Sequence, residues 1–124
     1  MHERIFVIES IDKFKFLLSI NPGLLVIKFG AEWCGPCKKI ESCVVEWMNK
    51  MPYNVQTAII DIDESFELYA YLKSKKMCRS IPAILMYNAG NESYIFDDAV
   101  ITSNVSEINK FFERCIESSK TISI

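Results

Sequence analysis

Few architectures can accommodate residues 24–29, whose sequence is Leu-Leu-Val-Ile-Lys-Phe. The run has the length of a strand, and its hydrophobic side chains follow one another without the alternation of a half-exposed strand. A nearly continuous apolar run of this length is typical of a strand buried on both faces. The chain is therefore predicted to contain a central sheet that helices cover on both sides.

The segments on either side of this run alternate between strand and helix patterns. Helices are predicted after Ser10, from Pro36 to residue 51, over residues 66–73, and from a capping box at Asn104 and Glu107. Alternation in the first half implies parallel strands, and the turn at residues 88–91 adds an antiparallel hairpin. We predict an α/β fold in one domain, residues 1–124, with a frayed tail at 119–124. Strands are predicted at residues 4–8, 24–29, 55–61, 83–87 and 93–96.

Composition and charge narrow the range of partners. Half of the 124 residues are hydrophobic, and the formal net charge is -2 without a dense basic run. We therefore expect no nucleic-acid partner. No apolar run approaches the ~20 residues of a membrane span, and the N-terminal segment lacks the apolar stretch of a signal peptide. The expectation is a cytoplasmic protein that does not bind membranes.

Cys34 and Cys37 lie at the transition from the buried strand to the next helix, in the sequence Trp-Cys-Gly-Pro-Cys. Disulfide exchange requires a thiolate, and the unpaired N–H groups at a helix start favour a negative charge. The two cysteines are one helical turn apart, so their sulfurs share a face. Gly35 leaves the approach open, and Pro36 suits the first helical turn. We predict that Cys34 attacks a substrate disulfide and that Cys37 resolves the mixed disulfide.

A C-x-x-C pair can also form half of a zinc site. Such a site would need two further cysteine or histidine ligands. The chain has five cysteines but a single histidine, His2, and no second C-x-x-C pair. We therefore expect no bound metal.

Two segments carry a family resemblance. Residues 28–38, Lys-Phe-Gly-Ala-Glu-Trp-Cys-Gly-Pro-Cys-Lys, resemble the active-site segment of the thioredoxin family, and Ser-Ile-Pro-Ala at 80–83 resembles the segment that faces it. The resemblance implies the thioredoxin fold, a central mixed sheet of about five strands flanked by about four helices. It also implies a redox-active disulfide between Cys34 and Cys37 and a cis Ile81–Pro82 bond. The implied substrate-binding residues are Trp33, Gly35, Pro36, Ile81 and Pro82.

The same resemblance implies a function and its partners. The protein is expected to be a thiol–disulfide oxidoreductase that reduces disulfides of client proteins through the Cys34/Cys37 dithiol. It would bind no cofactor, receive electrons from an NADPH-dependent thioredoxin reductase, and be a monomer. The alternative is a redox-inactive or narrow-specificity binding module, because Lys28-Phe29-Gly30 resembles a segment of the spliceosomal thioredoxin-like family.

Three positions near the site depart from the thioredoxin pattern. Lys28 replaces a buried acid, Ile59 replaces that acid's partner lysine, and Gly30 replaces a common aromatic residue. Lys28 has three open interpretations. A charged amine would favour a Cys37 thiolate, an amine with a pKa lowered by burial would act as a base, and a long side chain would reach solvent.

Two acids and three cysteines complete the candidate residues. Asp97 and Asp98 align near a glycine beside the family's substrate groove, where they would alter substrate choice or form a solvated strand end. Cys43 and Cys115 are predicted to pack as small apolar residues. Cys78 has basic neighbours that would favour a thiolate, and we interpret it as a surface thiol, with a regulatory or intermolecular disulfide as the alternative.

Overall fold

Strand β1 (Leu24–Gly30) lies inside a four-stranded sheet with the order β2–β1–β3–β4. The computed structural model describes residues 2–122. β2 (Val55–Asp61) is parallel to β1, whereas β3 (Ala83–Asn88) is antiparallel to β1 and β4 (Asp98–Val100) is antiparallel to β3. All seven residues of β1 are buried. The predicted α/β class and the buried strand in a mixed sheet are confirmed.

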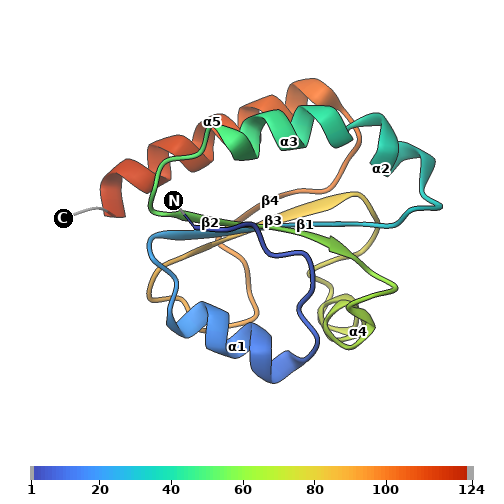
Figure 1. Ribbon diagram of the computed structural model, residues 1–124, viewed down its shortest axis with the longest axis horizontal. Helices are drawn as coiled ribbons and strands as arrows, with labels where there is room; N and C mark the ends of the chain where they lie inside the picture. Colours follow the sequence, from blue (N-terminus) through green and yellow to red (C-terminus); the bar gives the residue numbers. More distant parts are fainter. Residues whose placement is uncertain (1, 123–124) are drawn as a thin grey trace.

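Helices cover both faces of this sheet. α1 (Ile11–Ser19) and α4 (Phe66–Ser74) lie on one face, and α3 (Glu41–Asn49) and α5 (Val105–Ile122) lie on the other (Figure 1). α2 (Gly35–Lys39) lies beyond the carboxyl end of β1. Because neighbouring residues of a strand face opposite ways, Ile27 and Phe29 enter one hydrophobic cluster while Leu24 and Val26 enter the other. Burying each such side chain stabilises the fold by about 1.5–3 kcal/mol.

Two predicted helix starts are confirmed by their caps. The backbone N–H of Lys13 donates to Ser10 Oγ at 3.0 Å. The backbone N–H of Glu107 donates to Asn104 Oδ1, also at 3.0 Å. Each bond satisfies a donor that has no partner within its own helix.

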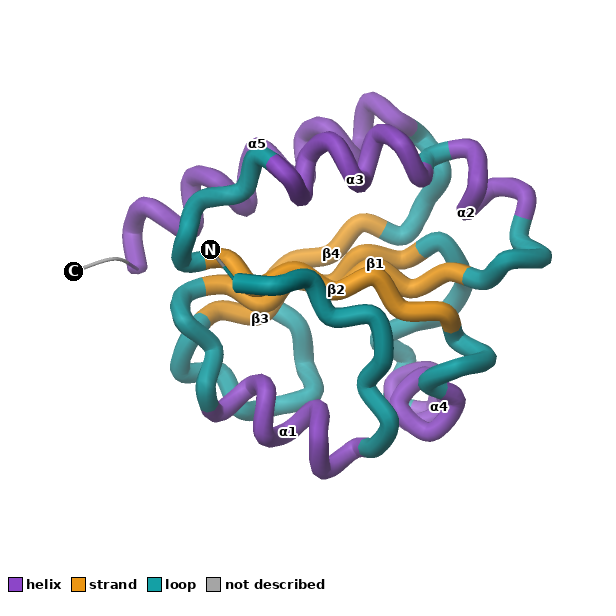
Figure 2. Tube along the Cα trace, viewed as in Figure 1, coloured by secondary structure: helices purple, strands orange, loops and turns teal. Residues whose placement is uncertain are grey.

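The sheet has four strands rather than about five, because two predicted strands do not form. Around residues 4–8, Ile5 makes only an isolated bridge to Ala58, along the edge of β2 (Figure 2). The N–H of Ile8 donates instead to Ser65 Oγ at 3.0 Å. At residues 93–96, short polar side chains bond the local backbone, as in the bond from the Ser93 N–H to Asn91 Oδ1 at 2.9 Å. Such local bonds compete with strand pairing, and the hairpin partner of β3 is β4 instead.

The structure has five helices in residues 2–122 rather than about four. The predicted helix from Pro36 is divided at Ile40, whose φ of -105° and ψ of 1° leave helical geometry. Cys37 packs in one hydrophobic cluster and Ile40 in the other, so the chain changes direction between them. The last helix is longer than predicted: residues 119–122 continue α5 and Ser119 is buried, whereas residues 123–124 of the predicted tail lie outside the described residues.

Candidate active site

Cys34 and Cys37 are joined by a disulfide, with their Cα atoms 5.3 Å apart. Cys34 is the N-cap residue of α2, and the backbone N–H of Cys37 donates to Cys34 Sγ at 3.2 Å. Pro36 occupies the first turn of the helix, as predicted. Both cysteines are buried, but Gly35 and Pro36 between them are exposed. The sulfur of Cys34 therefore accepts a hydrogen bond next to two exposed residues of the helix start.

Trp33 and the Ile81–Pro82 bond lie at the same end of the sheet. The Ile81–Pro82 bond is cis, as predicted. Phe29 pairs with Ala83, so residues 81–82 lie beside the chain that leaves the carboxyl end of β1. Ile81 is half-buried and Pro82 is buried, whereas the side chain of Trp33 is 68% exposed. The structure thus brings the residues of both motifs together around the disulfide.

The position of Trp33 depends on an acid that the sequence motifs did not indicate. The indole Nε1–H of Trp33 donates to Asp63 Oδ2 at 2.9 Å. Asp63 is held in turn by its own N–H, which donates to Asp61 Oδ1 at 2.8 Å. A carboxylate just beyond the predicted strand at residues 55–61 was the only available signal.

Lys28 lies in the centre of the sheet and is only 5% exposed. Its neighbours across β2 and β3 are Ile59 and Ile84, so no acid pairs with it along the strands. The side chain as a whole is therefore buried, and its amine lines an internal cavity rather than lying on the outer surface. Burial lowers the pKa of Lys28, whereas the negative charges of Glu41 and Asp61 act in the opposite direction.

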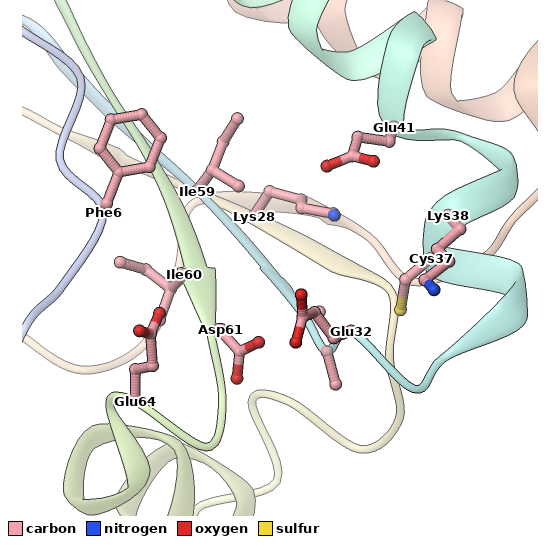
Figure 3. A pocket seen from close by; sticks show the side chains of 12 residues that line it. Phe6, Lys28, Glu32, Cys37, Lys38, Glu41, Ile59, Ile60, Asp61 and Glu64 are labelled. Carbon is pink, nitrogen blue, oxygen red and sulfur yellow. The ribbon is translucent and has the colours of Figure 1, made fainter.

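The amine of Lys28 enters a cavity of about 350 Å³ that adjoins Cys37. Figure 3 shows the side chain directed toward Cys37, between Glu41 and Glu32. The wall contains several acids that the motifs did not indicate, because they come from other elements. The charged residues that line the cavity with Lys28 are Glu32, Lys38, Glu41, Asp61 and Glu64.

Asp97 and Asp98 are not beside the redox pair. β4 is antiparallel to β3, and Asp98 pairs with Met86, about four residues along β3 from Pro82 and so some ~13 Å away. The Asp97 carboxylate accepts from the backbone N–H of Asn88 at 2.7 Å, and Asp98 forms an ion pair with Arg114 at 2.8 Å. The predicted effect of these acids on substrate choice is therefore wrong, because both carboxylates stabilise the other end of the hairpin.

The three remaining cysteines are free thiols. Cys115 is fully buried, as predicted, and Cys43 is half-buried. Cys78 is also fully buried, so its interpretation as a surface thiol is wrong. Burial raises the pKa of Cys78 to about 12, and the opposing charge of Lys73 is too weak to compensate. Basic neighbours along the chain do not activate this thiol.

Residues 2–122 contain neither a cluster of metal ligands nor a membrane-spanning helix. No group of three or more His, Cys, Asp and Glu side chains in this range is placed to hold a metal ion. None of the helices described there combines the length and the apolar character needed to cross a bilayer.

Both the sequence and the fold are similar to those of known proteins. The thioredoxin family model matches residues 6–113. Thioredoxin 3 of Plasmodium falciparum is 31% identical over 103 residues, which are 82% of this chain and 54% of that protein, so the chain spans about half of that relative's length. The thioredoxin of Chlamydia trachomatis is 32% identical over 89 residues, covering 69% of this chain and 79% of that protein. The crystal structure of thioredoxin from Trypanosoma brucei brucei has a TM-score of 0.70 at 25% identity and covers 91% of both chains. The chain belongs to the thioredoxin family.

Proposed function

We propose that this protein is a thiol–disulfide oxidoreductase that reduces the disulfides of client proteins. The observation that carries the proposal is the Cys34–Cys37 disulfide at the start of α2, beneath an exposed helical turn. The family match over residues 6–113 supports the same chemistry. A redox-inactive binding module would not need two cysteines in this arrangement.

The reaction follows from the positions of the two sulfurs. The thiolate of Cys34 attacks one sulfur of a client disulfide, the client S–S bond breaks, and the second client sulfur leaves and takes up a proton. Cys37 then loses its proton and attacks Cys34 Sγ, which breaks the mixed disulfide and releases the first client sulfur. The client gains two electrons, and the protein is left with the Cys34–Cys37 disulfide.

The client is proposed to bind over the surface that surrounds the disulfide. Trp33 offers a large exposed aromatic face, which the bond to Asp63 holds in place. Gly35 and Pro36 are exposed, and Cys34 lies directly beside them along the chain with 6% of its surface exposed. Ile81 and Pro82 border the same end of the sheet, where they would shape a groove for an extended client segment. Lys28 is proposed to act electrostatically on the Cys37 sulfur from the internal cavity, on the side away from the client.

Renewal of the dithiol requires an external electron donor. We propose an NADPH-dependent thioredoxin reductase as that donor, with no cofactor bound to this chain itself. A cytoplasmic location is part of the same proposal, since a reducing compartment maintains the dithiol form. We also propose that the protein is a monomer.

The test is reduction of insulin disulfides by the purified protein, with dithiothreitol as the electron donor. We expect a rate well above the reagent background, and we expect Cys34→Ser to lower it to that background. Cys43→Ser is the matched control, because this half-buried thiol lies on α3, outside the disulfide, and should leave the rate unchanged. A folded wild-type protein with no rate above background would favour the binding-module alternative or a narrow client range.

The resolving role of Cys37 is tested separately. Cys37→Ser should trap mixed disulfides between Cys34 and client proteins, because the step that releases the client is lost. The trapped species should dissolve on addition of excess reductant and be absent from a Cys34→Ser/Cys37→Ser double variant. If Cys37→Ser traps no client while insulin reduction by the wild type proceeds, another group resolves the intermediate.

A further inference from the structure

Lys28 is an unusual residue for the centre of a sheet. It lies in a strand whose every residue is buried, and its cross-strand neighbours are isoleucines. Within residues 2–122 its amine makes no hydrogen bond or ion pair. Burying a charged amine without a partner costs free energy, so such a residue needs a compensating interaction.

Gly30 leaves the space that the Lys28 side chain uses. A Cβ atom at residue 30 would lie 3.0 Å from Lys28 Nζ, 3.3 Å from Lys28 Cε and 3.4 Å from the Cβ atom of Cys37. Contacts at 3.0 Å are tighter than nine in ten real Cβ contacts, so the end of the Lys28 side chain would have to shift. The lysine amine and the base of the Cys37 side chain therefore border the same small space, which exists only because residue 30 has no side chain.

The charges around this amine come from four parts of the chain. Glu41 begins α3, Asp61 ends β2, and Lys38 lies on α2. Glu32 follows β1 and Glu64 follows β2. Burial lowers the pKa of Lys28, but the acids outnumber the bases in the cavity wall, and their charges oppose that effect and favour the ammonium form. Among the described residues that line the cavity with Lys28, Cys37 alone carries a sulfur.

We propose that Gly30 and Lys28 form one positioning unit, in which Gly30 admits the Lys28 ammonium to the cavity where it pairs with the thiolate of Cys37 in the reduced protein. This inference rests on the proposed function, because it concerns the redox balance of the same site. Its consequence is that Lys28 raises the reduction potential of the Cys34–Cys37 pair.

The direction of the effect follows from the charges in the two redox states. Reduction by a dithiol transfers two electrons to the S–S bond, which breaks, while the reagent is oxidised to its disulfide. Each cysteine sulfur ends as a thiol or a thiolate according to the protons it takes up. A Cys37 thiolate beside a Lys28 ammonium holds as many protons as a Cys37 thiol beside a neutral amine, so no further reactant is needed.

Only the reduced state gives the ammonium a thiolate partner. In the oxidised state both sulfurs are neutral, and the charged groups around Lys28 are the surrounding carboxylates and the Lys38 amine. Pairing in the reduced state therefore stabilises the dithiol form relative to the disulfide. A stabilised reduced form makes a pair more oxidising. An acid at the same position would have the opposite effect on a Cys37 thiolate.

The test is the equilibrium constant for reduction of the Cys34–Cys37 disulfide by dithiothreitol, measured by trapping the free thiols. Lys28→Met should lower this constant about tenfold, which corresponds to about 30 mV toward a more reducing pair. Gly30→Ala should lower it in the same direction by less, because its Cβ displaces the Lys28 amine. In a Lys28→Met background, Gly30→Ala should have little further effect, since the two residues act together.

Two controls separate this effect from a general change of charge or structure. Lys15→Met removes the same charge from an exposed position on α1 and should leave the equilibrium constant unchanged. In a Cys34→Ser background, Lys28→Met should raise the pKa of the Cys37 thiol, followed through the pH dependence of alkylation. A structural role for Lys28 would alter the unfolding temperature without moving either quantity.

The outcomes are distinguishable from those of the insulin assay. An unchanged or increased equilibrium constant in folded Lys28→Met would overturn the proposal, as would an equal effect of Gly30→Ala with and without Lys28. The equilibrium with dithiothreitol requires no client protein. A wild type that fails to reduce insulin but shows the expected shifts would therefore sink the proposed function and leave the pairing of Lys28 with Cys37 intact.

Discussion

Cys34 and Cys78 pack in the same hydrophobic cluster but have opposite surroundings. Their exposed fractions are only 6% and 0%, so accessibility of the thiol alone does not separate them. Cys34 Sγ accepts a backbone N–H, whereas Cys78 Sγ lies 3.9 Å from the carbonyl oxygen of Ser80. A donor stabilises a thiolate and an acceptor does not. The polar group that faces the sulfur therefore distinguishes Cys34, the proposed nucleophile, from the buried thiol of Cys78.

Charge along the chain is a poor substitute for this local geometry. The residues flanking Cys78 are strongly basic, yet burial raises its pKa to about 12. Cys115 on α5 behaves in the same way, and burial again raises its pKa to about 12. Cys43 is half-buried, and burial and the charge of Glu46 both raise its pKa.

The largest expected difference between the two kinds of cysteine is the rate of alkylation. A thiol with an ordinary pKa of ~8.5 has at least about a thousandfold more thiolate at neutral pH than a thiol with a pKa of about 12. In the reduced protein, iodoacetamide should therefore modify Cys34 at least about a thousandfold faster than Cys78. Peptide mass spectrometry after timed quenching measures both rates. Modification of Cys78 at a rate similar to that of Cys34 would contradict the predicted difference in thiolate content.

The second difference concerns stability at alkaline pH. Burial raises the pKa of Cys78 from a reference value of 9.0 to about 12 in the folded protein. Its contribution to stability is therefore complete below pH 9.0 and is lost as the pH rises toward 12. The loss is at most about 1.4 kcal/mol per pH unit for one thiol.

Urea unfolding at a series of pH values above 9.0 measures this slope. The wild type should lose stability more steeply than Cys78→Ala, because the variant has no thiol to ionise at that position. Lys28, whose pKa is lowered, changes stability in the opposite direction below 10.5 and is present in both proteins. Equal slopes would show that Cys78 ionises as readily in the folded protein as in the unfolded chain.

The smallest expected effect is that of replacing each thiol by a hydroxyl. Cys78→Ser should lower the free energy of unfolding by about 1–3 kcal/mol, because a buried hydroxyl replaces an apolar group and the Ser80 carbonyl is too distant for a normal hydrogen bond. Cys43→Ser, at a half-buried site, should cost less than about 0.5 kcal/mol. Denaturant unfolding measures both values. Equal losses would contradict a special environment for Cys78.

Much of the fold was predictable because it depends on local patterns. The run at residues 24–29, the caps at Ser10 and Asn104, and the strand at residues 55–61 all formed as their sequences predict. The spacing of Cys34 and Cys37 likewise predicted two sulfurs on one face of a helix start, and the family resemblance implied the disulfide that joins them. These features need only residues that are close along the chain.

The features that the sequence did not predict depend on contacts between segments that are distant along the chain. The side chain of Lys28 looks the same in the sequence whether it reaches solvent or a cavity, and its surroundings come from Gly30, Glu41 and Asp61 on three different elements. The burial of Cys78 and the loss of a strand at residues 4–8 have the same origin. Hydrophobic periodicity reports which face of an element is buried, but the dielectric and the charges around one side chain depend on what packs against it. Only the tertiary structure specifies those neighbours, because desolvation and charge pairing act through space rather than along the chain.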